Sequence, residues 1–245
     1  MTSRGVRRSR SEEEEESYFI SMADMMVGLL FVFIILLLYF ALQFRQTTDA
    51  LAGANQTRTL ILKTLEKQLK DRGLKVTIDT DTGVLRLPED VLFDKGRSVL
   101  TPQGQAAVGI VATEMARVLP CYTFGVPRPA GCPSSLHRID ALFVEGHTDK
   151  DPMAGPKDNL DLSVERATNT YRALKAAAPL LTEMRNLPAG EGEPLPILSV
   201  SGYGPDRPVN PGDSDAAKAK NRRIDLRFLM VTPRAPDSLT GMLVR

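Results

Sequence analysis

The segment YFISMADMMVGLLFVFIILLLYFAL, residues 18–42, carries no charge between positions 25 and 42. At a helical rise of about 1.5 Å per residue, about 20 such residues cross the hydrocarbon core of a bilayer. The segment is too long for the apolar region of a cleavable signal peptide and has no small-residue cleavage site. We therefore predict a transmembrane helix over residues 18–42 that remains in the mature protein.

Asp24 lies where this span begins, in the string SMADMMVG. Moving a carboxylate out of water is costly, so a residue of this kind usually faces a bundle interior, a polar cavity or an ion path. The alternative is an aspartate at the headgroup boundary that only ends the apolar run. By position alone the second interpretation is favoured, because Asp24 is close to the edge of the span.

The charges beside the span predict its orientation. Arg45 is the only basic residue close behind it. Four arginines precede it: Arg4, Arg7, Arg8 and Arg10. The positive-inside rule then places residues 1–17 in the cytoplasm as a solvated tail and everything after about residue 45 outside. The acidic run from Glu12 to Glu16 does not reverse this, since acidic residues contribute little to orientation.

Length and composition narrow the function classes. A chain of 245 residues has room for one globular domain beside the span, and its net charge of +1 gives no argument for nucleic acid. The sequence has no Trp and only two His, and it contains no CxxC or HExxH string, so no metal and no cofactor is expected. Cys121 and Cys132 share one Pro/Gly-rich loop, and they are expected to form a disulfide if that loop lies outside the cytoplasm.

Residues 43–73 are predicted to be a helical linker on the outer side of the membrane. Leu62, Leu65 and Leu69 recur at helical spacing, and Gly73 is a typical C-terminal stop. So narrow an apolar stripe fits either pairing with a second copy or packing on the protein's own domain. The pattern leaves both open.

The pattern of predicted strands and helices from residue 74 to residue 231 indicates one α+β domain. A strand pair surrounds a DTG turn, a helix begins near Thr101 with Pro102 in its first turn, and a buried strand follows at RIDALFVEG. A second helix over about residues 160–178 and two further strands complete the order β–α–β–α–β–β. We expect helices on one face of a mixed sheet, followed by a tail over residues 232–245.

Four strings stand in order within this domain: VLFDKGRSVLTPQG, VEGHTD, NLDLSVERA and NRRIDLRF. Together they resemble the OmpA-like peptidoglycan-binding domain over about residues 74–231. The resemblance implies that Asp149 and Arg166 bind the amine and carboxylate ends of the peptidoglycan stem peptide. It also implies pocket-shaping residues, namely Asn159, Leu162 and Ser163, with Asn221 and Arg222 on the far wall.

The two charged side chains of that implied site match the charged groups of diaminopimelate. A guanidinium offers a planar donor fork to a carboxylate, and a carboxylate accepts from an ammonium group, so diaminopimelate satisfies both. The alternative is that Asp149 and Arg166 bridge each other or cap the helix at Leu160. The loop KDPMAGPKD, the cysteine loop and residues 179–196 are longer than is typical of the family, which leaves the affinity for peptidoglycan open.

The whole layout is similar to MotB, the wall-anchored, ion-conducting stator subunit. A short N-terminus, one span with an Asp-bearing string, a helical linker and an OmpA-like domain follow one another, so Asp24 matches the ion-carrying aspartate. Within this group the chain most resembles the ZorB family of Zorya anti-phage systems. The resemblance implies a homodimer inside about five copies of a MotA- or ZorA-like membrane partner, passing H⁺ or Na⁺.

Three alternatives remain at this point. A MotB-type flagellar or gliding stator has the same layout, and a plain peptidoglycan tether would leave Asp24 idle. An enzyme is disfavoured: His147 and Asp149 resemble half a catalytic pair, but no Ser or Cys nucleophile string accompanies them.

Overall fold

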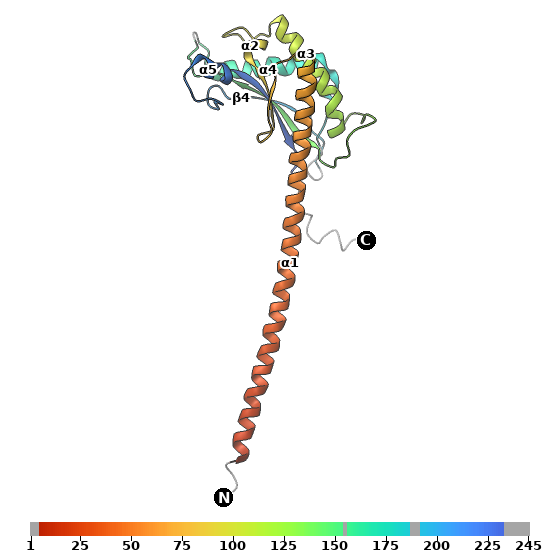
Figure 1. Ribbon diagram of the computed structural model, residues 1–245, viewed down its shortest axis with the longest axis vertical. Coiled ribbons are helices and arrows are strands. Elements are labelled where there is room, and N and C mark those ends of the chain that lie inside the picture. The colour runs from red at the N-terminus through yellow and green to blue at the C-terminus, as the bar shows by residue number, and fades with distance from the viewer. Residues whose placement is uncertain (1–4, 154–155, 187–191, 233–245) are drawn as a thin grey trace. The chain divides into compact units, whose positions relative to one another are not determined.

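The structure is a computed structural model that describes residues 5–153, 156–186 and 192–232. Its described residues fall into two compact units that meet between Ala50 and Leu51, the second being Leu51–Thr232. Helix α1, Gly5–Asp71, contributes to both units (Figure 1). Each unit is described by itself below.

The first unit contains the apolar part of α1. This helix holds one segment long and apolar enough to cross a membrane, with a mean hydropathy of 2.9 over its best window. Its apolar side chains are exposed in the single chain, from Tyr18 to Phe44. The apolar helix predicted over residues 18–42 is therefore confirmed, and its surface is available to lipid or to another protein.

The second unit is built on one five-stranded sheet with the strand order β1-β2-β5-β3-β4. The strands are β1 Thr77–Asp79, β2 Val84–Pro88, β3 Ile139–His147, β4 Leu198–Gly202 and β5 Arg223–Met230. Only β3 and β4 pair in parallel; the other neighbours are antiparallel. The predicted α+β class with a mixed sheet is confirmed.

The helices of this unit are α2 Glu89–Leu92, α3 Pro102–Val118, η1 Leu119–Tyr122, α4 Asn159–Ala177, η2 Pro179–Thr182 and α5 Asp215–Asn221. Three of them, α3, α4 and α5, begin at residues whose side chains cap the first turn. The Thr101 hydroxyl accepts from the amide of Gly104, and Asp158 forms a reciprocal capping box with Asp161. Helix α5 lies where a polar loop was predicted, because seven residues are too few to display a helical period.

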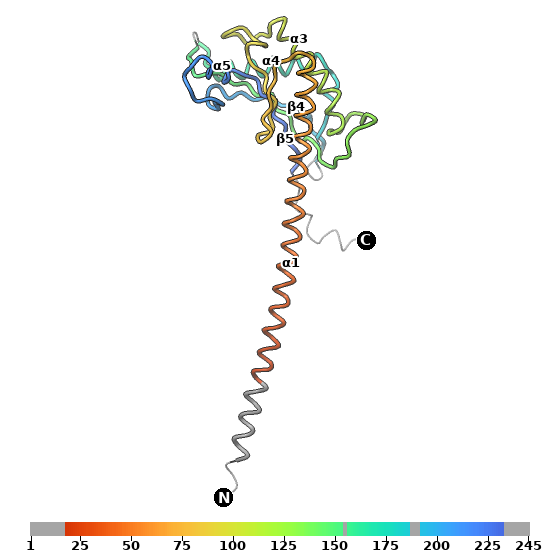
Figure 2. Tube along the Cα trace, viewed as in Figure 1, coloured from red at the N-terminus to blue at the C-terminus, as the bar shows by residue number. Residues whose placement is uncertain are grey.

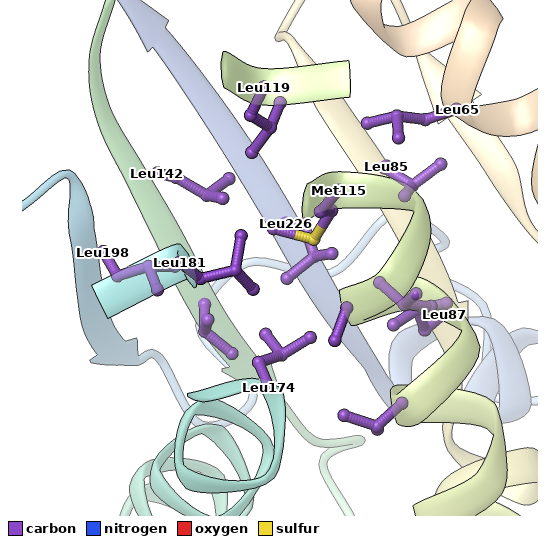
Figure 3. Packing of buried hydrophobic residues seen from close by; sticks show 14 of the residues in the cluster. Leu65, Leu85, Leu87, Met115, Leu119, Leu142, Leu174, Leu181, Leu198 and Leu226 are labelled. Atoms are coloured by element: carbon purple, nitrogen blue, oxygen red, sulfur yellow. The ribbon is translucent and has the colours of Figure 1, made fainter. Parts of the chain in front are cut away.

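The core lies between the sheet and the two long helices α3 and α4. Alternate residues of a strand point to opposite faces, and the inward set includes Leu85, Leu142 and Leu226, all fully buried. Figure 3 shows these leucines gathered around Met115 of α3, with Leu174 of α4 close by. Burying one such side chain contributes about 1.5–3 kcal/mol.

The last turns of α1 pack on the same core. Leu62, Leu65 and Leu69 are completely buried, so this stripe packs on its own domain within the single chain. In Figure 2 the end of α1 lies beside α3, and there the guanidinium of Arg72 pairs with the buried Glu114 at 2.8 Å. Of the two possibilities that the leucine spacing left open, these residues therefore show packing on the protein's own domain, not pairing with a second copy.

The predicted disulfide between Cys121 and Cys132 is present, with the two Cα atoms 5.4 Å apart. The segment after Cys132 returns to α1, where the hydroxyls of Ser135 and Thr57 lie 3.0 Å apart. The side chain of His137 lies close to Gly53 here, since an added Cβ would lie 2.3 Å from Nε2 of His137. The disulfide loop is therefore fastened to the side of α1.

Candidate functional site

The predicted peptidoglycan-binding residues meet at one end of the sheet. Strands β3 and β5 are antiparallel, so the end of β3 lies beside the start of β5, with His147 opposite Arg223. Asp149 follows β3, Arg222 precedes β5, and Arg166 projects from the first half of α4. Three segments that are far apart in sequence therefore bring these side chains to one place.

Four charged side chains form a continuous chain of ion pairs there. Asp149 Oδ2 lies 2.7 Å from Nη1 of Arg222, and Nε of Arg222 lies 3.2 Å from Oε2 of Glu89. Oε1 of Glu89 lies 2.6 Å from Nη2 of Arg166. Asp149 and Arg166 therefore do not bridge each other, and Glu89 joins the two halves of the site.

Arg166 is held rigidly in this network. Its side chain is only 2% exposed, its Nε donates to the carbonyl oxygen of Arg97 at 2.8 Å, and its guanidinium lies 5.3 Å from the centre of the Phe93 ring. Nη1 makes no hydrogen bond with any described residue. Of the three guanidinium nitrogens, Nη1 is therefore the one without a partner in the described part of the chain.

Glu89 is the residue that sequence reasoning missed. Burial raises its pKa, although Arg166 and Arg222 both act to lower it. The only sequence signal was an acidic residue directly after the strand VLRLP, two positions before the string that begins at Val91. Its partner Arg166 is 77 positions away, so no local pattern could have found the pair.

The other predicted residues hold the loops of the site in place. Asn159 donates to the backbone oxygens of Asp149 at 3.2 Å and Asp151 at 2.8 Å. The Ser163 hydroxyl accepts from the amide of Gly204 at 2.9 Å. Asn221 accepts from the amide of Val209 at 2.9 Å. Leu162 is buried. Asn159, Ser163 and Asn221 therefore position the site through hydrogen bonds to backbone atoms, and Leu162 does so by packing.

A second buried polar cluster lies on the sheet face turned away from α3 and α4. Glu145, His147 and Asp225 bring three possible metal-ligating atoms within 4.8 Å of one another. Arg227 already holds Glu145 through two bonds of 2.8 Å, and Arg223 holds Asp225 at 3.0 Å. With both carboxylates neutralised in this way, the cluster suits an ion-pair network better than a cation site.

The same cluster explains His147. Burial lowers the pKa of His147, and its ring stacks on Tyr203 with centroids 5.3 Å apart. Burial acts to raise the pKa of Glu145, but His147 and Arg227 lower that pKa to about 2. Nε2 of His147 faces Glu145 and Asp225 at 3.8 and 3.5 Å. The histidine therefore belongs to this network and does not form a pair with Asp149.

Asp24 lies on α1 in the first unit and is exposed in the single chain. Gly28 follows one helical turn later, so both share one face of the helix. A Cβ at Gly28 would meet no atom within 4 Å. This face therefore offers a carboxylate beside a place where another helix can approach closely.

No protein-family model matches the chain. Among solved structures, the chain is similar to a putative MotB-like protein from Desulfovibrio vulgaris, with 22% identity and a TM-score of 0.49 over 78% of this chain and 99% of that one. Among curated proteins it is similar to the Zorya protein ZorB of Escherichia coli O139:H28 (strain E24377A / ETEC). The identity to ZorB is 22% over 229 residues, which cover 91% of this chain and 85% of that protein. This match confirms the resemblance to ZorB that the sequence motifs indicated.

The probable lipoprotein YiaD of Escherichia coli (strain K12) is also similar, at 26% identity over 162 residues and 66% of this chain. The chain spans 58% of the length of YiaD.

Proposed function

We propose that this protein is the wall-anchored subunit of an ion-driven stator complex in the bacterial inner membrane, and that it acts as the ZorB component of an anti-phage defence system. The observation that carries the proposal is the similarity to ZorB along 91% of the chain. It extends over both the apolar helix and most of the α+β unit, and neither part alone would account for it. The protein is not an enzyme in this proposal.

The α+β unit binds peptidoglycan through the end of the sheet. Nη1 of Arg166 donates to a carboxylate of the stem peptide, and Asp149 accepts from the ammonium group of diaminopimelate. Glu89 and Arg222 fix both side chains in advance, since each is paired with a neighbour of opposite charge. Binding then costs little reorganisation of the protein.

The apolar helix spans the membrane once, with the N-terminus in the cytoplasm and the α+β unit in the periplasm. The arginines before the span support this orientation. The disulfide between Cys121 and Cys132 also supports it, because such bonds persist in oxidising compartments. A reporter enzyme fused after Arg245 is expected to be active only in the periplasm; activity in the cytoplasm would overturn this topology.

Asp24 carries the transported ion, H⁺ or Na⁺, at the contact with a MotA- or ZorA-like partner. Two copies of this chain stand within about five copies of that partner. An uncompensated carboxylate at this depth is expensive, so its occupancy can shift a conformational equilibrium by several kcal/mol. Asp24→Asn resembles the protonated form in shape but cannot release a proton, and is expected to stop the cycle.

The test is phage protection in cells that carry the complete operon. Asp24→Asn is expected to abolish protection while the membrane partner is still recovered with this chain. Asp24→Glu keeps the chemistry and moves the carboxylate by one methylene, so it is the matched variant and should retain part of the protection. If Asp24→Asn still protects, this protein is an anchor only.

Wall binding is tested separately, by co-sedimentation of the protein with purified sacculi. Arg166→Ala is expected to lose more binding than Asp149→Asn, because it removes a charge-assisted donor that contributes about 1.5–3 kcal/mol. Lys175→Ala, on the same helix and outside the ion-pair chain, is the control. If both site variants sediment like the parent protein, the binding site lies elsewhere.

A further inference from the structure

A groove of about 810 Å³ has Glu89 and Arg222 among its lining residues, whereas Asp149 and Arg166 do not line it. Arg86 of β2 is among its lining residues. Arg86 alternates with core leucines along β2, so this part of the groove lies on the sheet face turned away from α3 and α4. The candidate site and the groove therefore share two side chains and form one continuous surface.

Five apolar residues line the groove. Leu74 and Val76 come from the segment that follows α1, Pro88 ends β2, Val209 lies in the loop before α5, and Ala219 lies on α5. These are small or branched apolar side chains with no polar group to satisfy. Such a surface accommodates the methyl groups of alanine residues, which the polar end of the sheet does not.

Charged side chains also line the groove, and they differ in whether they form ion pairs with other residues. Arg86 pairs with Asp79 at 3.0 Å. Lys75 and Lys220 also line the groove, and neither has an ion pair with any residue that the structure describes. Both are exposed. These two lysines therefore carry the positive charge of the groove that has no ion-pair partner among the described residues.

Asp90 is the acidic counterpart. It is exposed, lines the same groove and forms no ion pair within the described part of the chain. A groove lined by apolar residues, two unpaired lysines and one unpaired carboxylate matches a short peptide that carries more carboxylates than amines. A polyanion such as a phosphate chain fits less well, because it has no apolar groups to contact the apolar lining residues and because Asp90 repels it.

We propose that this groove is a second subsite for the wall peptide, which takes the part of the stem peptide that continues beyond the diaminopimelate residue. The methyl group of the alanine that follows diaminopimelate contacts the apolar lining, and the terminal carboxylate reaches Lys75 and Lys220. The inference rests on the proposed peptidoglycan binding at Arg166 and Asp149. It extends that site from recognition of one residue to recognition of a peptide.

The experiment is calorimetric titration of the full-length protein in nanodiscs with two probes. The first probe is free meso-diaminopimelate, and the second is a soluble disaccharide-tetrapeptide that contains diaminopimelate. Charge reversal of both lysines, Lys75→Glu with Lys220→Glu, is compared with the parent. The matched control reverses two exposed lysines of α1 outside the groove, Lys63→Glu with Lys67→Glu.

The parent is expected to bind the tetrapeptide about four- to twenty-five-fold more tightly than free diaminopimelate, since each of the two lysine contacts is expected to contribute about two- to five-fold. Reversal of Lys75 and Lys220 should remove that preference and leave the affinity for diaminopimelate unchanged. The control should behave like the parent. If the reversed protein keeps the preference, the groove is not a subsite, although the primary site stands. If the parent binds neither probe, the proposed peptidoglycan binding fails and this inference fails with it.

Discussion

Replacing Glu89 with alanine tests the ion-pair chain at the candidate site. The change removes the carboxylate that lies 2.6 Å from Nη2 of Arg166, and Arg166 then retains only the carbonyl oxygen of Arg97. Its side chain is 2% exposed, so water cannot replace the lost partner. Removing one member of a buried pair typically costs about 3–5 kcal/mol. The loss of Glu89 costs less at Arg222, because the Arg222 side chain is 28% exposed and keeps its ion pair with Asp149.

The measurement is urea unfolding of the compact unit Leu51–Thr232, followed by circular dichroism. We expect Glu89→Ala to lower the free energy of unfolding by about 3–5 kcal/mol and Glu89→Gln, which keeps the shape and one hydrogen bond, by about 1.5–3 kcal/mol. The neighbouring Asp90→Ala is the control and should stay within about 0.5 kcal/mol of the parent, since Asp90 is exposed. Glu89→Met combined with Arg166→Met should recover most of the loss, because no buried charge is left unpaired.

A loss for Glu89→Ala as small as that of the Asp90 control would refute this reasoning. It would mean that Arg166 is solvated in the folded protein. Arg166 would then not be fixed in advance for a ligand, and the low cost of binding argued above would no longer hold.

Three further predictions concern stability. Glu145→Gln should be about 3 kcal/mol less stable than the parent at pH 7. The difference should shrink as the pH falls from 4.5 toward 2, because a lowered carboxyl pKa stabilises the fold only while the group is ionised. A difference in unfolding free energy that stays constant across that pH range would contradict this prediction. Cys121→Ser in the exported protein should cost about 2–3 kcal/mol of unfolding free energy under non-reducing conditions, and dithiothreitol should lower the parent to the same level. Leu65→Ala should cost about 2–5 kcal/mol, whereas Leu60→Ala, at an exposed position of the same helix, should cost far less in thermal unfolding.

The helices and strands were largely predictable because their signals are local. Thr101 before Pro102 marks the start of α3, and the alternation in RIDLRF marks β5. Helix α5 escaped prediction because its seven residues give no readable period and its cap, Ser214, sits among turn residues.

Burial on the outer face of the sheet was not predictable from the pattern. Alternating charges along a strand normally indicate a solvated face, yet Asp225 is 1% and Arg223 6% exposed. Arg223 and Asp225 pair with each other at 3.0 Å, and Asp225 also faces Arg86 of β2, while Arg227 of β5 pairs with Glu145 of β3. Only the pairing of distant strands reveals that these charges neutralise one another. The same limit hid Glu89, whose two arginine partners lie on other elements.

The most direct test of wall anchoring compares two soluble muropeptides that differ only in the third residue of the stem peptide. One carries meso-diaminopimelate and the other lysine, which lacks the second carboxylate that Nη1 of Arg166 is proposed to bind. Calorimetric titration of the full-length protein should show binding of the diaminopimelate form and an affinity at least about ten-fold lower for the lysine form, because a charge-assisted hydrogen bond contributes about 1.5–3 kcal/mol. Equal affinities, or no binding of either muropeptide, would contradict the account.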